Sequence, residues 1–160
     1  MCGIVGFVTN AKEKKKIIKE MADTINHRGP DGEGYYVDQD VALGHKRLSI
    51  IDINGGAQPM YNDREDIVIV YNGEIYNYPE LKSELEQKYE FKTTCDTEVL
   101  VHGYEEWGSD LPSKLRGMFA FAIWDKNKQK LFCARDPFGI KPFYYYHKDD
   151  TFLFASEIKA

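Results

Sequence analysis

The second residue, Cys2, can place two reactive groups on one residue. Cysteine is small enough for the initiator Met1 in front of it to be removed, which leaves a thiol and a free α-amine together. Their reference pKa values, about 8.5 for the thiol and about 7.7–8.0 for the amine, both lie near neutral pH. The amine can take the thiol proton, directly or through one water, and later return it to a leaving group. Cys2 is therefore a candidate nucleophile that carries its own general base.

The dipeptide Asn72-Gly73 offers hydrogen-bond donors for such a reaction. When a thiolate attacks an amide, negative charge develops on the carbonyl oxygen, and one missing donor raises the barrier by about 3–4 kcal/mol. Asn72 has a side-chain NH₂ group and Gly73 an unshielded main-chain N–H. The same dipeptide is also the most frequent tight turn of β-hairpins, and taken alone it favours that plain turn.

Three charged residues have the chemistry to hold a free amino acid. Arg47 follows a strand-like segment, and arginine suits bidentate capture of a carboxylate. Glu74 and Asp96 are candidates for holding an α-ammonium group. Each has a structural alternative: Arg47 is also a typical surface ion-pair partner, and Asp96 is well placed to cap the first turn of a helix.

No cofactor is expected in this chain. The four histidines show no metal-ligand spacing and are interpreted as structural or surface residues (His27, His45, His102 and His147), so no metal site is predicted. Neither a GxGxxG nor a GxxxxGK loop occurs, so no nucleotide site is predicted. Three cysteines at wide spacing fit neither a disulfide framework nor a zinc site.

Composition narrows the class of protein further. The 160 residues fit one domain, and the net charge of −5 leaves no basic face for nucleic acid. No apolar run approaches the roughly 20 residues that span a bilayer, and no signal peptide is evident, so a cytoplasmic protein without membrane contact is expected.

The hydrophobic pattern predicts an α+β sandwich. Strands joined by hairpins imply antiparallel sheets, with amphipathic helices packed on their outer faces. The expected strands are residues 4–8, 35–37, 41–48, 67–71, 118–124, 130–134, 143–146 and 152–155. The expected helices are residues 13–26, a helix that starts at residues 78–79, residues 96–107 and a short turn at 111–115. Residues 27–32 and 52–60 are expected loops.

Several motifs in fixed order resemble the class II glutamine amidotransferases, the N-terminal nucleophile glutaminase domains. They are the MCGIVG start, HRGPDG at 27–32, GHKRLSIID at 44–52 and YNGEIY at 71–76. Further motifs look specifically like the glutamine-hydrolysing asparagine synthetases: DTE at 96–98, GMFAFA at 117–122, RDPFGIKP at 135–142 and SEIKA at 156–160. The resemblance covers the whole chain.

The resemblance implies a four-layer αββα sandwich and a reaction. Cys2 would attack the side-chain amide of L-glutamine, release ammonia and leave a γ-glutamyl thioester for water to hydrolyse. Asn72 and Gly73 would form the oxyanion hole. The substrate would be held by Arg47 at its carboxylate, by Glu74 and Asp96 at its ammonium end, and by the main chain of the pocket segment Leu48, Ser49, Ile50 and Ile51. The role of residues 27–32 is left open.

The resemblance also implies a larger protein. Residues 1–160 would be the glutaminase domain, and residues 156–160 look like the first turn of a helix that continues, so we expect an N-terminal fragment. Ammonia would pass to a C-terminal domain that amidates aspartate and holds ATP and magnesium. Three alternatives remain: a sister family with another ammonia acceptor, an N-terminal cysteine hydrolase for a different amide, and a non-catalytic glutamine-binding regulatory domain. Whether two copies form a homodimer is left open.

Overall fold

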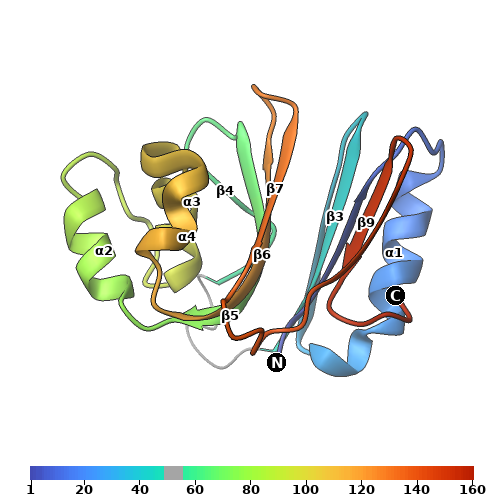
Figure 1. The fold of residues 1–160 in the computed structure, drawn as a ribbon, viewed down its shortest axis with the longest axis horizontal. Helices are drawn as coiled ribbons and strands as arrows, with labels where there is room; N and C mark the ends of the chain where they lie inside the picture. The colour runs from blue at the N-terminus through green and yellow to red at the C-terminus, as the bar shows by residue number, and fades with distance from the viewer. Residues whose placement is uncertain (49–55) are drawn as a thin grey trace.

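Two antiparallel sheets packed face to face form the centre of the protein. The structure is a computed structural model that describes residues 1–48 and 56–160. Helices cover the outer face of each sheet, so four layers follow one another in the order helix, sheet, sheet, helix (Figure 1). This confirms the expected α+β, αββα sandwich.

The first sheet carries the N-terminus. Its strand order is β2-β3-β1-β9-β8, with β1 at Gly3–Val8, β2 at Gly32–Val37, β3 at Val41–Arg47, β8 at Tyr144–Lys148 and β9 at Thr151–Ala155. The central strand β1 is apolar on both faces, because Val5 and Phe7 pack against helix α1 (Lys14–Thr24) while Ile4 faces the other sheet. Burial on both sides explains why this strand reads as a continuous apolar run.

The second sheet has the order β4-β5-β6-β7. Its strands are β4 at Met60–Tyr61, β5 at Ile67–Ile75, β6 at Gly117–Asp125 and β7 at Lys130–Arg135. Three helices cover its outer face: α2 at Tyr78–Leu85, α3 at Asp96–Trp107 and α4 at Leu111–Lys114. Pro79 lies in the first turn of α2, as the sequence predicts. Three-residue 3₁₀ turns complete the elements, η1 at Asn26–Arg28 and η2 at Gly108–Asp110.

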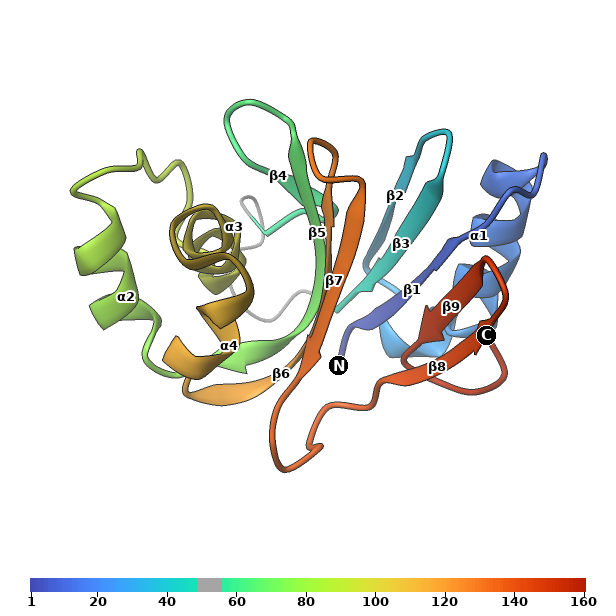
Figure 2. The ribbon, with the colours of Figure 1, turned by 45° about the horizontal axis from the view of Figure 1, so that its top comes forward.

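Apolar side chains from both sheets fill the space between them. Ile4 and Leu43 from the first sheet meet Val70, Ala122 and Trp124 from the second. This apolar packing ends on one side where β1 begins, and there polar residues replace the apolar ones. The start of β1 and the N-terminus consequently lie between the sheets at one end of the sandwich (Figure 2).

Two local expectations from the sequence are wrong. Asn72-Gly73 is no turn: β5 continues to Ile75, with Asn72 paired to Ala120 and Gly73 to Phe119. The partner strand β6 lies far along the chain, so a rule for adjacent strands fails here. Asp96 begins α3 but forms no cap, since α3 has no side-chain cap hydrogen bond.

Smaller differences concern loops and ends. Asn26–Arg28 form η1, where the sequence predicts the last residue of a helix and the start of a loop. Met60–Tyr61 form β4, which begins at the last residue of the expected 52–60 loop; residues 52–55 of that loop lie outside the described residues. Residues 156–160 form no helix and close a single turn through the hydrogen bond from Ala160 N–H to Glu157 O. Within the described ranges, no helix is long and apolar enough to cross a membrane.

Candidate active site

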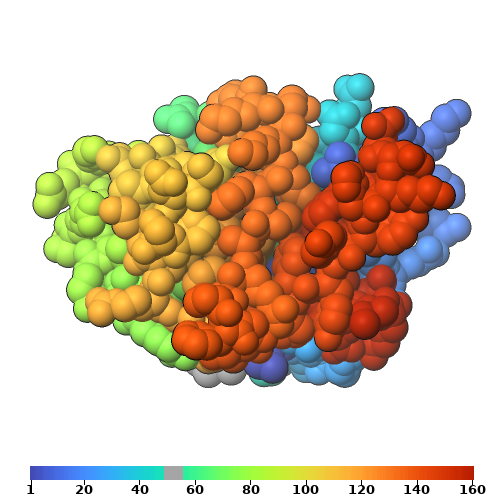
Figure 3. Space-filling view, viewed as in Figure 1, coloured from blue at the N-terminus to red at the C-terminus, as the bar shows by residue number. Residues whose placement is uncertain are grey.

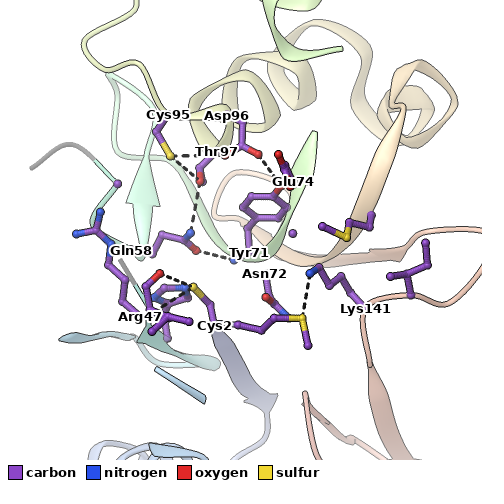
Figure 4. A pocket seen from close by; sticks show the side chains of 17 residues that line it. Cys2, Arg47, Gln58, Tyr71, Asn72, Glu74, Cys95, Asp96, Thr97 and Lys141 are labelled. Carbon is purple, nitrogen blue, oxygen red and sulfur yellow. Dashed lines mark hydrogen bonds between the residues drawn. The ribbon is translucent and has the colours of Figure 1, made fainter. Parts of the chain in front are cut away.

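A cavity of about 410 Å³ opens where the start of β1, the end of β3 and the C-terminal half of β5 meet (Figure 4). Every sequence-predicted site residue that the structure describes lines it: Cys2, Arg47, Leu48, Asn72, Gly73, Glu74 and Asp96. Ser49, Ile50 and Ile51, the rest of the expected pocket segment, lie outside the described residues. The fold therefore brings together groups that the sequence spreads over 95 positions.

The thiol of Cys2 lies at the end of the first sheet where the central strand β1 begins. Gly3 pairs with Lys46, so Cys2 comes just before the strand and beside the end of β3. The main-chain N–H of Leu48 points to the Cys2 sulfur at 3.4 Å, and the sulfur lies 3.7 Å from the Leu48 carbonyl oxygen. Both main-chain groups of Leu48 therefore hold the Cys2 side chain next to the end of β3.

The main chain of Cys2 is anchored by Arg28. Its Nε donates to the Cys2 carbonyl oxygen at 3.1 Å, and its Nη1 donates to Glu157 at 3.1 Å. Burial would raise the pKa of Glu157, but hydrogen bonds from Arg28, His27 and Lys159 hold this pKa at about 2. The segment at residues 27–32, whose role the sequence left open, thus supplies a residue that holds the main chain of Cys2.

Asn72 carries an unused hydrogen-bond donor at the cavity. The residue is 2% exposed, and its Nδ2 has no hydrogen-bond partner among the described residues. A buried unsatisfied donor costs about 1–3 kcal/mol, so a site that keeps one is suited to a ligand that accepts this hydrogen bond. An oxyanion is such a ligand.

Gly73 has no room for a side chain. A Cβ at this position would lie 2.4 Å from the Met118 carbonyl oxygen and 2.6 Å from the Tyr71 ring. Asn72 and Gly73 therefore line the cavity from the C-terminal half of β5, where only glycine fits beside Asn72.

Asp96 points across to β5 instead of capping its helix. Its Oδ2 accepts hydrogen bonds from the Tyr71 hydroxyl at 2.7 Å and from the Ile75 N–H at 2.9 Å. Burial and the neighbouring carboxylate raise the pKa of Tyr71 well above its usual value, so this hydroxyl stays a donor. Glu74, which is exposed, lines the same cavity and adds a second negative charge there.

Gln58 connects the strand to the helix behind the cavity. Its Oε1 accepts the Tyr71 N–H at 2.6 Å, and its Nε2 donates to the Thr97 hydroxyl at 3.4 Å. Figure 4 shows these contacts between Gln58, Tyr71 and Thr97, with Asp96 and Glu74 beyond them. The contacts brace β5 against the start of α3, which positions both Asn72 and Asp96.

His45 and Lys141 are among the cavity residues that the sequence did not predict. His45, interpreted as structural or surface, is 1% exposed and lines the cavity, and its Nε2 has no partner among the described residues. Burial lowers the pKa of His45 to about 3, so the ring is neutral. Lys141 is 4% exposed and also lines the cavity. Only alternation along β3, which places His45 on the same face as Arg47, could have indicated the first of these.

Charge is divided across the cavity. Arg47 and Lys141 supply positive charge, and Glu74 and Asp96 supply negative charge. Among the described residues, no group of histidine, cysteine and acidic side chains could hold a metal ion. The arrangement can bind a small molecule that carries both charges and present it to a thiol beside an oxyanion site.

The layer order and the position of the thiol define a class of protein. A four-layer αββα sandwich with a cysteine nucleophile at the start of a central strand is the architecture of the N-terminal nucleophile hydrolases. Among solved structures, the glutamine phosphoribosylpyrophosphate amidotransferase of Bacillus subtilis matches 98% of this chain with a TM-score of 0.82. At 24% identity and 42% coverage of that chain, this likeness establishes the fold.

The chain belongs to the glutamine amidotransferase domain family, whose model matches residues 1–160. It is 50% identical to asparagine synthetase [glutamine-hydrolyzing] 1 of Bacillus subtilis and 42% identical to asparagine synthetase B [glutamine-hydrolyzing] of Escherichia coli. Both matches cover the whole of this chain, but only 26% and 30% of those proteins. The resemblance noted in the sequence is therefore confirmed, and the chain spans less than a third of these two relatives.

Proposed function

We propose that this domain hydrolyses the side-chain amide of L-glutamine to glutamate and ammonia through a covalent intermediate on Cys2. The single observation that carries the proposal is the meeting of the Cys2 sulfur, the unpartnered Asn72 amide and oppositely charged ends in one cavity. Membership of the amidotransferase family supports glutamine as the substrate.

The charged ends of the cavity set the orientation of the substrate. Arg47 binds the α-carboxylate, and Glu74 and Asp96 hold the α-ammonium group. Leu48, together with Ser49, Ile50 and Ile51, provides main-chain contacts along the side chain. A bound zwitterion then has its amide directed to the sulfur, which excludes peptides and uncharged amides as good substrates.

The reaction has two steps. With Met1 removed, the Cys2 amine accepts the thiol proton, the sulfur attacks the amide carbon, and Asn72 and Gly73 stabilise the oxyanion. The carbon–nitrogen bond of the amide breaks as the Cys2 amine returns its proton to the departing nitrogen. Ammonia is released, and a γ-glutamyl thioester remains on Cys2. Water, deprotonated by the same amine, attacks the thioester, which releases glutamate and restores the thiol.

The destination of the ammonia belongs to the rest of a longer protein. The names of the relatives support glutamine-dependent synthesis of asparagine, with residues 1–160 as the glutaminase domain. We propose aspartate as the acceptor of the ammonia, with ATP and magnesium bound outside this domain. The synthetase domain is then the partner of this domain. A cytoplasmic location is part of the proposal, since a reducing compartment keeps the Cys2 thiol free.

Ammonia release measured with Cys2→Ala and the unchanged protein tests the proposal. We expect turnover only in the protein whose mature N-terminus is Cys2, and binding of glutamine without turnover in Cys2→Ala. Turnover in Cys2→Ala would overturn the assigned nucleophile. Binding without turnover in the processed, unchanged protein would instead favour a regulatory glutamine-binding domain, and hydrolysis coupled to another acceptor would favour a sister family.

A further inference from the structure

Lys141 is a buried cation without a carboxylate partner in the described ranges. The Lys141 side chain is 4% exposed, and none of the ion pairs among the described residues includes Lys141. Lys46, which is 3% exposed, shows the usual solution, because the carboxylates of Asp23 and Glu33 both pair with it. An ammonium group removed from water without a counter-charge costs several kcal/mol, so the position of Lys141 calls for a reason.

The backbone fixes where this cation lies. Lys141 belongs to the connection from β7 to β8, which crosses from the second sheet to the first along one side of the molecule (Figures 2 and 3). Its N–H donates to Asp136 at 3.0 Å and its carbonyl oxygen accepts from Arg135 at 2.6 Å. Asp136 also accepts the Phe119 N–H at 3.3 Å, and Phe119 pairs with Gly73. The connection is thus tied to the strand that carries the oxyanion site.

The ammonium group points to the N-terminal end of the chain. Lys141 Nζ donates to Sδ of Met1 at 3.1 Å, and Met1 is bonded to the nitrogen of Cys2 (Figure 4). Lys141 and Cys2 line the same cavity. When Met1 is removed, the cation faces the space beside the new α-amine and the thiol.

We propose that Lys141 is a charged residue of the active site that keeps the Cys2 amine unprotonated and the Cys2 thiol ionised near neutral pH; this rests on the proposed function. A nearby positive charge disfavours an ammonium group and favours a thiolate, so it lowers both pKa values and acts in the same direction on base and nucleophile. Thiolate and neutral amine are the forms that the first step of the reaction needs.

Other charged groups also face Cys2, and the test must hold them constant. Arg28 in η1 donates to the Cys2 carbonyl and is paired with Glu157. The other titratable groups that line the cavity are Arg47 and the neutral His45 on β3, Tyr71 and Glu74 on β5, Cys95 just before α3, and Asp96 on α3. All of them are unchanged in a Lys141 variant, so a difference between that variant and the parent reports Lys141.

The test is the rate at which iodoacetamide alkylates Cys2, measured as a function of pH. The sample is processed protein without glutamine. Peptide mass spectrometry separates alkylation of Cys2 from that of Cys95 and Cys133. In Lys141→Met we expect the midpoint to move to higher pH and the rate near neutral pH to fall about five- to tenfold, because the thiolate loses a neighbouring positive charge. Lys141→Arg should retain the parent profile. Lys148→Met, the same change at an exposed position on β8, is the matched control.

Identical profiles for the parent and a folded Lys141→Met would overturn the inference. Lys141→Gln, which keeps a polar end in the cavity, provides the same comparison if Lys141→Met does not fold. The pH profile of ammonia release should shift in the same direction. An alkylation shift in a protein that releases no ammonia would refute the proposed function and leave the charge effect standing, so the two failures are distinguishable.

Discussion

The Tyr71 hydroxyl donates a 2.7 Å hydrogen bond to Asp96, and this contact turns a helix-terminal carboxylate into a cavity residue. Asp96 begins α3, where its side chain could have satisfied the helix's own N–H groups. It instead faces β5, with the Ile75 N–H as its second donor. The carboxylate is therefore held in place before any ligand arrives, and its position depends on a residue next to Asn72 in the chain.

Removal of this hydroxyl should weaken glutamine binding. In Tyr71→Phe, Asp96 loses one donor and its orientation is less fixed, so we expect KM for glutamine to rise several-fold, with a smaller change in kcat and a loss of about 1 kcal/mol of stability. Steady-state kinetics and denaturant unfolding measure the two effects. Tyr104→Phe removes a similar hydrogen bond to Asp125 at 3.3 Å away from the cavity and should affect stability alone. Equal KM values in the two variants would contradict the role of Asp96.

Truncation of Asn72 should act on the transition state. The Nδ2 donor has no partner to lose among the described residues, so we expect Asn72→Ala to lower kcat about 10²- to 10³-fold with little change in KM. Asn127→Ala, at an exposed turn, should keep the parent kcat. A large rise in KM with kcat preserved would instead assign Asn72 to substrate binding.

Loss of the charge on Glu157 should reach the nucleophile through Arg28. Glu157→Gln keeps the shape but weakens the hold on the guanidinium that binds the Cys2 carbonyl. We expect kcat to fall several-fold while the melting temperature changes little, since the network is partly exposed. Lys159→Gln breaks a 3.2 Å contact to the same carboxylate without touching Arg28 and should leave kcat unchanged. A matching loss in both variants would argue against transmission through Arg28.

The His102 cluster should make stability depend on pH. Burial alone would lower the pKa of His102, but Glu98 and Glu105 raise it above its usual value. A raised pKa means that the protonated ring stabilises the fold below about pH 6.5, and that this contribution disappears as pH rises through the folded-state pKa.

The measurement for this cluster is the free energy of unfolding of the parent and His102→Gln across that interval. On the acid side of the interval we expect the parent to have a free energy of unfolding about 1 kcal/mol larger than that of His102→Gln. This difference should shrink as the pH increases. His147→Gln, at an exposed position on β8, is the control and should show no such trend. A pH-independent difference in His102→Gln would show that only the ring stacking with Tyr89 matters.

The sequence predicts this site from local signals together with the resemblance of its motifs to a family. The position of Cys2 after Met1 and the place of Arg47 at the end of a strand each leave a structural alternative open, and the resemblance favours the functional interpretation. The turn expected at Asn72-Gly73 fails because β5 pairs with a strand more than 40 positions away, and that pairing keeps the dipeptide extended. Asp96 fails as a cap because its hydrogen-bond donors come from another element.

Lys141 illustrates what no local pattern reveals. A lysine in a loop rich in glycine and proline is normally solvent-exposed. Its burial follows from the path of the connection between the two sheets and from Asp136, which fixes the loop from inside. Both depend on the packing of distant strands, so only the three-dimensional structure reveals that this cation borders the cavity.

Mass spectrometry of the processed protein, quenched with acid during turnover of glutamine, tests the central claim most directly. We expect a γ-glutamyl adduct on the peptide that begins with Cys2 and no adduct in Cys2→Ala. The adduct should accumulate when the thioester is hydrolysed slowly. Ammonia release at the parent rate from a protein whose Cys2 amine is still blocked by Met1, or an adduct on Cys95 instead, would contradict this claim.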